Sequence, residues 1–348
     1  MEQLTREMNQ ISAQVEQLFQ GYDFKMEELF QLLLQGKITD VTKMLFQNMA
    51  QAFSGEVGSY VEMLAMLLSV GILSALLMNL TDLFKNKQIG DLSFYFIYLF
   101  LILVLIQVFE MIVGTAGNLM SDMLLLLKLM MPIYFIAVGA AAGVTTALVY
   151  HQCVLGLIFV IELSLDKILL PVIQAYVFLA FMNGLWKDER LQMLLKLIRQ
   201  LIGYILKLSL AIITGISLIQ SMITPVMNSV KMSAMQKAVG MIPGVGNISS
   251  SAAEMVIGSA VLIKNSAGVL VIILLLALCA LPLIKIWFLS FTLKVAAALS
   301  SMVSDKRLVS CMDTVGEGGL MVFRTLLTFC ALFLIMTAIA ALTTNRGF

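Results

Sequence analysis

Charged residues are scarce in this sequence. Asp, Glu, Lys and Arg make up 12% of its 348 residues, against roughly 25% in an average soluble domain. Hydrophobic residues make up 60%, and a chain this apolar cannot bury all of its hydrophobic surface in a water-soluble fold. The net charge of +1 provides no basic field to attract nucleic acid. We therefore expect the lipid bilayer to be the main solvent, and we expect no nucleic-acid partner.

The residues that indicate catalysis are also missing. The only histidine, His151, cannot form an H-E-x-x-H zinc helix, which needs two histidines. There is no G-x-x-x-x-G-K-[ST] phosphate loop, so any nucleotide energy must come from a partner. The isolated Cys153, Cys279, Cys311 and Cys330 predict neither a disulfide framework nor a zinc site. We expect no enzymatic activity, no metal and no cofactor.

Residues 1–56 differ in composition from the rest of the chain. They are rich in glutamine and charge, and apolar residues recur at helical spacing from Leu4 to Leu18. This pattern predicts an amphipathic helix, which either rests on the membrane or on this protein's own helices, or pairs with a partner helix. No export signal is visible, so the first span is expected to direct insertion unless a signal has been removed before Met1.

Residues 57–348 are predicted to form a polytopic helical membrane domain. A helix needs about 20 residues to cross a hydrocarbon core of about 30 Å. The sequence therefore predicts an all-α protein with seven to eight transmembrane or re-entrant helices. The predicted spans are 60–80, 92–114, 130–150, 153–184, 200–224, 266–286 and 320–342.

The block 153–184 is too long for one plain span. As a single helix it would measure about 50 Å, so a helical hairpin or a broken helix is predicted. Glu162 and Asp166 share one helix face, where two carboxylates repel unless one is protonated or Lys167 screens them. They either cap the tip of the hairpin in the headgroup region, or they line a polar lumen or a subunit contact.

Two residues near the end of the chain complicate the spans there. Pro282 could cut the span at 266–286 short, which leaves room for another crossing before Lys306. Arg324 lies within the last span and is expected to extend its charge to the membrane surface.

Loop charges predict the orientation. Lys85 and Lys87 mark a cytoplasmic loop, as do the basic residues at 187–199. This arrangement places residues 1–56 outside the cytoplasm.

Gly139 and Gly143 form a G-x-x-x-G pattern in an apolar span. Helix backbones can approach closely at such a pattern. The neighbouring helix belongs either to the same chain or to another subunit.

The block 240–268 combines helix breakers with a polar helix. Pro243, Gly244 and Gly246 exclude a regular helix through 240–246. A small and polar stripe at helical spacing follows, and it predicts either a surface helix under a loop or a re-entrant, pore-facing helix. This candidate pore or assembly segment comprises Pro243, Gly244, Gly246, Asn247, Ser251, Glu254, Gly258, Lys264 and Asn265.

The same block resembles the signature stretch of the stage III sporulation protein AE family of endospore-forming bacteria. The likeness lies in Ile242-Pro-Gly-Val-Gly246 and in the residues that lead through Glu254 to Asn265. It implies a membrane channel or scaffold subunit of the complex that joins the mother cell to the forespore. It also implies a place in the mother-cell membrane around the forespore, and as partners other stage III sporulation A-type membrane proteins and a cytoplasmic ATPase. Family members usually begin with an export signal, which is not visible here.

The residues alone leave other functions open. A secondary transporter or permease for a small solute is the main alternative, because broken helices are also expected there. A regulatory membrane protein without a pore is a third. Self-association is open in each case.

Overall fold

The computed structural model describes residues 38–83, 87–142, 162–186, 191–212 and 246–343, together with a few isolated positions. Nearly all of these residues are helical, and none lies in a strand. The prediction of an all-α fold is therefore confirmed for the described part of the chain. Its elements are α3 (Ile38–Leu83), α4 (Lys87–Ala142), the π-helix η1 (Glu162–Leu169), α6 (Leu170–Leu185), a helix over 192–212, α8 (Gly246–Ser300) and α9 (Lys306–Thr343).

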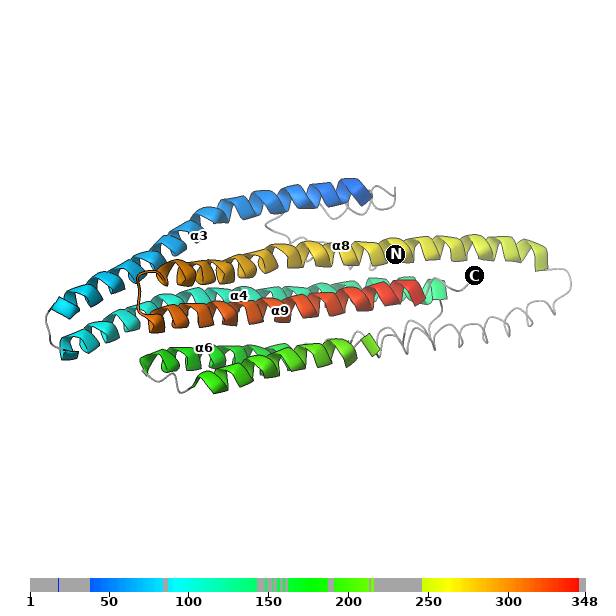
Figure 1. Cartoon of the computed structure of the whole chain (residues 1–348). Helices are drawn as coiled ribbons and strands as arrows, with labels where there is room; N and C mark the ends of the chain where they lie inside the picture. The colour runs from blue at the N-terminus through cyan, green and yellow to red at the C-terminus, as the bar shows by residue number, and fades with distance from the viewer. Residues whose placement is uncertain are drawn as a thin grey trace.

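The helices pack as a bundle with roughly parallel axes (Figure 1). The most extensive contact joins α8 to α9, which form an antiparallel pair linked by a turn at 301–305. Helix α4 packs on both of them, α6 packs on α9, and α3 packs on α8 and α4. At the start of α9, the Asp305 carboxylate accepts a hydrogen bond of 2.8 Å from the Arg307 backbone N–H, which caps the helix.

Four helices within the described residues contain segments long and apolar enough to cross a membrane: Leu92–Leu129, Lys167–Leu185, Val271–Ser300 and Lys306–Ile335. A shorter apolar stretch, Val57–Leu73, lies in α3. These segments carry apolar side chains on their exposed faces as well as on their buried faces. On α4, for example, Leu101 and Leu105 are buried while Phe96 and Leu103 are 67% and 61% exposed. A helix that is apolar all round suits lipid, so the fold is that of a multi-pass membrane protein.

The predicted break between the spans at 92–114 and 130–150 is not found, because α4 runs continuously from Lys87 to Ala142. The intervening residues include Gly117, Asn118 and Asp122, which resemble a polar connection in the sequence. In the structure, Leu119 and Met123 from this stretch are buried in the core. Packing against neighbouring helices outweighs the weak helix propensity of these residues.

Pro282 does not shorten its span, and no additional crossing lies between Pro282 and Lys306. The proline lies inside α8, which continues to Ser300. A proline removes one backbone hydrogen bond and is tolerated in membrane helices where neighbours hold the chain. Here Leu278 and Ile286, one turn to either side of the proline, are both buried.

The chain does not reverse between Glu162 and Leu185, so the predicted hairpin tip at Glu162 and Asp166 is not found there. The π-helix η1 leads directly into α6, with Pro171 in the first turn of α6. The interruption predicted from the charges and the proline therefore takes the form of a change in helix type.

Helix α3 crosses residue 56 without a break. The division into 1–56 and 57–348 stays a prediction, as do the seven to eight spans. The amphipathic pattern from Leu4 onward lies outside the described residues except for Leu18, which packs against the core.

Candidate functional site

A buried carboxylate lies within the bundle. Glu317, on α9, is 5% exposed, and three cations from three helices approach it. Arg199 Nη2 of the 192–212 helix lies 2.8 Å from Oε1, and Arg324 Nη1 lies 3.5 Å from the same oxygen. Lys294 Nζ of α8 lies 3.2 Å from Oε2 and also donates a 3.0 Å hydrogen bond to Asp313 Oδ1. We call these five residues the Glu317 cluster.

The contacts of Glu317 are ion pairs. Oε1 is buried and has no hydrogen bond of ordinary geometry, although Arg199 is close. A carboxylate in this setting depends on the positive charges around it, because removal from water is costly for an ion without partners.

Glycines next to Glu317 let three helices meet there. A Cβ at Gly318 would press against the Val177 side chain of α6. A Cβ at Gly319 would collide with Ser290 of α8, and one at Gly316 would also lie tight against α8. The sequence Gly316-Glu317-Gly318-Gly319 thus lets the backbone of α9 approach its neighbours closely, as small residues do at membrane helix contacts.

The Glu317 cluster lies near the middle of the apolar bundle. The apolar segment Lys167–Leu185 is about 28 Å long at 1.5 Å per residue, close to the thickness of the hydrocarbon core. Val177, which touches the Gly318 position, lies about halfway along it. A charge at this depth costs about 2.5–3.5 kcal/mol on insertion scales, and charges kept there usually serve a function. We therefore take the Glu317 cluster as the candidate functional site.

A second polar region lies where α6 ends and α9 begins. The Tyr98 hydroxyl of α4 donates a 2.8 Å hydrogen bond to the Phe181 carbonyl of α6, and both groups are buried. Gly184 admits the Tyr98 ring, since a Cβ there would lie 2.7 Å from Cζ. The Arg307 guanidinium lies 3.4 Å from the centre of the Phe94 ring, in a cation–π contact.

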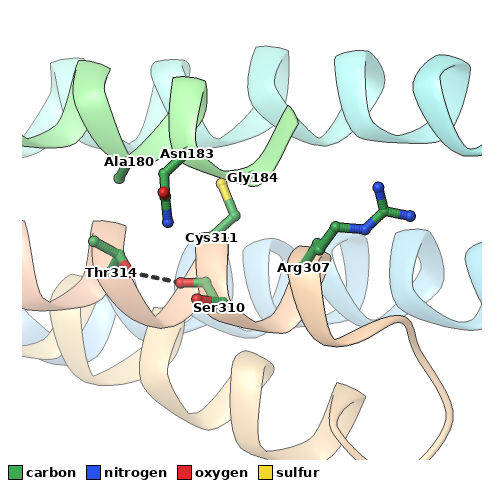
Figure 2. Close-up of a pocket in the computed structure, with 7 residues that line it drawn as sticks. All are labelled: Ala180, Asn183, Gly184, Arg307, Ser310, Cys311 and Thr314. Carbon is green, nitrogen blue, oxygen red and sulfur yellow. Dashed lines mark hydrogen bonds between the residues drawn. The ribbon is translucent and has the colours of Figure 1, made fainter. Parts of the chain in front are cut away.

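A small hollow lies beside these contacts, between α6 and α9. Figure 2 shows the Cys311 sulfur pointing toward α6 and the Arg307 guanidinium turned away from the other lining residues. Two of its polar groups are engaged: Asn183 Oδ1 accepts a hydrogen bond from the Leu191 N–H, and the Thr314 hydroxyl donates to the Ser310 carbonyl. This region joins the helices and offers little to a ligand. The lining residues are Ala180, Asn183, Gly184, Arg307, Ser310, Cys311 and Thr314.

The described residues bring no three His, Cys, Asp or Glu side chains together in a group that could hold a metal ion. Cys279, Cys311 and Cys330 are free thiols buried in the core. Glu317 and Asp313 face cations of the chain itself, so the arrangement fits charge pairing between helices.

The predicted pore or assembly segment is described in part. Pro243 and Gly244 lie outside the described residues, and Gly246 is the first residue of α8. The predicted helix from Asn247 onward is present, and it carries Ser251, Glu254, Gly258, Lys264 and Asn265. Figure 1 shows this first part of α8 extending beyond the ends of α4 and α9. Whether its polar stripe lines a pore stays a prediction.

The other predicted site residues are dispersed. Glu162 and Asp166 lie in η1, and Lys167 is exposed at its end. Gly139 lies in α4, while Gly143 is outside the described residues. Of all the predicted site residues, Arg324 is the one that the structure places in the Glu317 cluster.

Sequence reasoning missed Glu317 because it placed the last span at 320–342, beyond this residue. A signal was present: Asp313, Glu317 and Arg324 follow one another at spacings of four and seven residues, on one helix face. A charge enclosed by three glycines in an apolar helix was a second signal. Nothing in the sequence indicated that Arg199 and Lys294 would join them, because they come from other helices.

Comparison with known proteins supports the sequence resemblance. The family model of stage III sporulation protein AE matches residues 24–344. Stage III sporulation protein AE of Bacillus subtilis (strain 168) is 23% identical over 283 residues, which cover 80% of this chain and 71% of the relative. No solved structure matches. Because the family model covers nearly the whole sequence, this chain belongs to the stage III sporulation protein AE family.

Proposed function

We propose that this sporulation membrane protein is a non-enzymatic channel or scaffold subunit of a secretion-like complex required for endospore formation. The observation that carries the proposal is α8, whose 55 residues span about 80 Å, far more than a bilayer needs. Its second half packs in the bundle. Its first half carries the family-like polar stripe and extends beyond α4 and α9 (Figure 1), as a segment that meets other subunits would.

The packing of the bundle also favours a scaffold, or a channel formed between subunits. In the described residues, the space between α4, α8 and α9 is filled by side chains such as Ile112, Leu289 and Leu326. A conduit would therefore have to run between copies or between this chain and another subunit. We place the complex in the mother-cell membrane around the forespore. The proposed partners are other stage III sporulation A-type membrane proteins and a cytoplasmic ATPase.

Leucine at both Gly244 and Gly246 tests this role. Gly244 follows Pro243, and glycine permits backbone conformations that a side chain opposes at about 1–3 kcal/mol per strained residue. Gly246 is the first residue of α8. We expect the double variant to accumulate normally in the membrane while heat-resistant spores fall sharply, and Glu254→Leu to give a milder loss.

The matched control is leucine at Gly55 and Gly58 of α3, where a Cβ meets no atom within 4 Å. This variant should sporulate normally. Normal spore counts with both Gly244 and Gly246 replaced would contradict an assembly role for this segment.

A secondary transporter is the second candidate, and the Glu317 cluster favours it, because charged groups at mid-membrane depth often bind coupling ions. The two functions differ in what the purified chain does alone. A transporter reconstituted in proteoliposomes would transport a solute, and Glu317→Gln would abolish that transport. A scaffold subunit would transport no solute.

A further inference from the structure

Glu110 is an exposed acidic residue in the apolar segment Leu92–Leu129 of α4. Leu103 and Met111, on the same side of the helix, are also exposed. No described cation lies within ion-pair distance of Glu110. A carboxylate on a lipid-facing surface is costly unless water or a partner reaches it.

Glu110 lies at the same depth in the bundle as the Glu317 cluster. Its neighbour Phe109 lies 3.6 Å from the position that a Cβ would take at Gly318, and Ile112 lies 3.0 Å from that position at Gly319. Both glycines directly follow Glu317 in α9. Since the axes of α4 and α9 run roughly along one direction (Figure 1), Glu110 is level with Glu317.

Glu110 and the cations around Glu317 face opposite sides of the α4 and α9 pair. Each helical residue turns the chain by about 100°, so Glu110 points away from Ile112, the residue that touches α9. By the same rule Arg324 points away from Gly319, which faces α4. The side chains of Arg199 and Arg324 are 52% and 55% exposed. One side of the molecule thus presents a negative charge, and the other side presents two positive charges at equal depth.

We propose that copies of this chain associate head to tail in the membrane, with Glu110 of one copy against Arg199 and Arg324 of the next. The Glu317 cluster has three cations and two carboxylates, so it carries one positive charge in excess, which Glu110 would balance. A second copy presents the complementary charge at the same depth as Glu110, so we take it as the partner. Such a contact uses two different surfaces, so it generates a ring where the rotation between copies closes.

The inference rests on the proposed role as a membrane subunit, and crosslinking between full-length copies in membranes tests it. One copy carries Met111→Cys, beside Glu110, and a differently tagged copy carries Leu327→Cys, one turn from Arg324. Both positions are exposed, and the charges themselves stay in place. Leu327 lies eight residues, about 12 Å, further along α9 than Gly319, so a bifunctional maleimide must span at least that distance. We expect a product that joins the two tags, and little product from Met111→Cys alone or Leu327→Cys alone.

Charge reversal then tests whether the ion pair holds the contact. Adding Glu110→Lys to the Met111→Cys copy should lower the mixed product about tenfold, as expected for loss of an interfacial charge pair. The control Glu62→Lys reverses an exposed acid on α3 and should leave the yield unchanged.

Three results would overturn the inference: no mixed product above that of either cysteine alone, a mixed product that Glu110→Lys does not reduce, or crosslinking of Leu327→Cys to a different protein. The spore counts for Gly244 and Gly246 are independent of this measurement. The contact between copies and the role in sporulation can therefore fail separately.

Discussion

Two layers of the same bundle differ sharply in composition. The first is the Glu317 cluster with its glycines. The second, which we call the Cys330 layer, comprises Cys279, Cys330 and Met123, and it lies about 20 Å further along α9 at 1.5 Å per residue. In it, Cys330 Sγ lies 3.9 Å from Met123 Sδ, and all three side chains are buried. Helices α4, α8 and α9 pass through both layers.

The difference shows that one bundle can contain a layer with strict requirements on volume and charge and a layer that tolerates substitution. In the first layer, helices approach through glycines and a buried charge depends on partners from other helices, so both volume and charge are constrained. In the Cys330 layer, soft apolar side chains fill the space and can adjust to small changes. Substitutions should therefore have much larger effects around Glu317 than around Cys330.

The largest effect is expected for Gly319→Leu. A Cβ at this position already collides with Ser290 and lies 3.0 Å from Ile112, so a leucine must push α4 or α8 away. Overpacking of this kind costs about 1–3 kcal/mol and sometimes more. We expect the variant to accumulate poorly in the membrane, which quantitative immunoblotting measures.

Gly117→Leu is the matched control, because a Cβ at Gly117 meets no atom within 4 Å. It should accumulate normally. Equal accumulation of the two variants would mean that α9 does not approach its neighbours as closely as the glycines indicate.

The next effect in size is expected for Glu317→Gln. The change keeps the volume but leaves Arg199 and Lys294 without their shared carboxylate. Breaking a buried pair costs about 3–5 kcal/mol, and the partial exposure of these cations should reduce the cost to about 1–3 kcal/mol. The thermal midpoint of the detergent-purified protein should fall by several degrees.

Asp313→Asn is the comparison for Glu317→Gln. Asp313 also pairs with Lys294, but its side chain is 57% exposed, and an exposed ion pair contributes about 0–1 kcal/mol. If the two variants lowered the midpoint equally, burial of Glu317 would not be the source of its importance.

The smallest effect is expected in the Cys330 layer. Met123→Leu conserves volume and should cost less than about 1.5 kcal/mol. Cys330→Ala removes one buried sulfur and should also cost about 1 kcal/mol. Both proteins should accumulate normally and unfold within a few degrees of the unaltered protein. A loss as large as that of Glu317→Gln would show that the two layers do not differ as described.

The sequence predicted the helical class, the membrane setting and the family because each depends on local composition. Long apolar runs predict membrane helices wherever they occur, and the family likeness lies in contiguous residues around Pro243 and Glu254. The continuity of α4 was not predicted, and the effect of Pro282 on α8 was left open. Gly117 and Pro282 weaken a helix locally, but buried neighbours such as Met123 and Ile286 hold it intact.

The sequence by itself determined that this chain crosses membranes, since 60% hydrophobic residues leave no soluble alternative. Only the tertiary structure decided which charges meet. Arg199, Lys294 and Glu317 lie far apart in the sequence, and their pairing depends on how the 192–212 helix, α8 and α9 pack together. A buried carboxylate pairs with the cations that lie close to it in space, and residue spacing along a single helix does not reveal which cations of other helices those are.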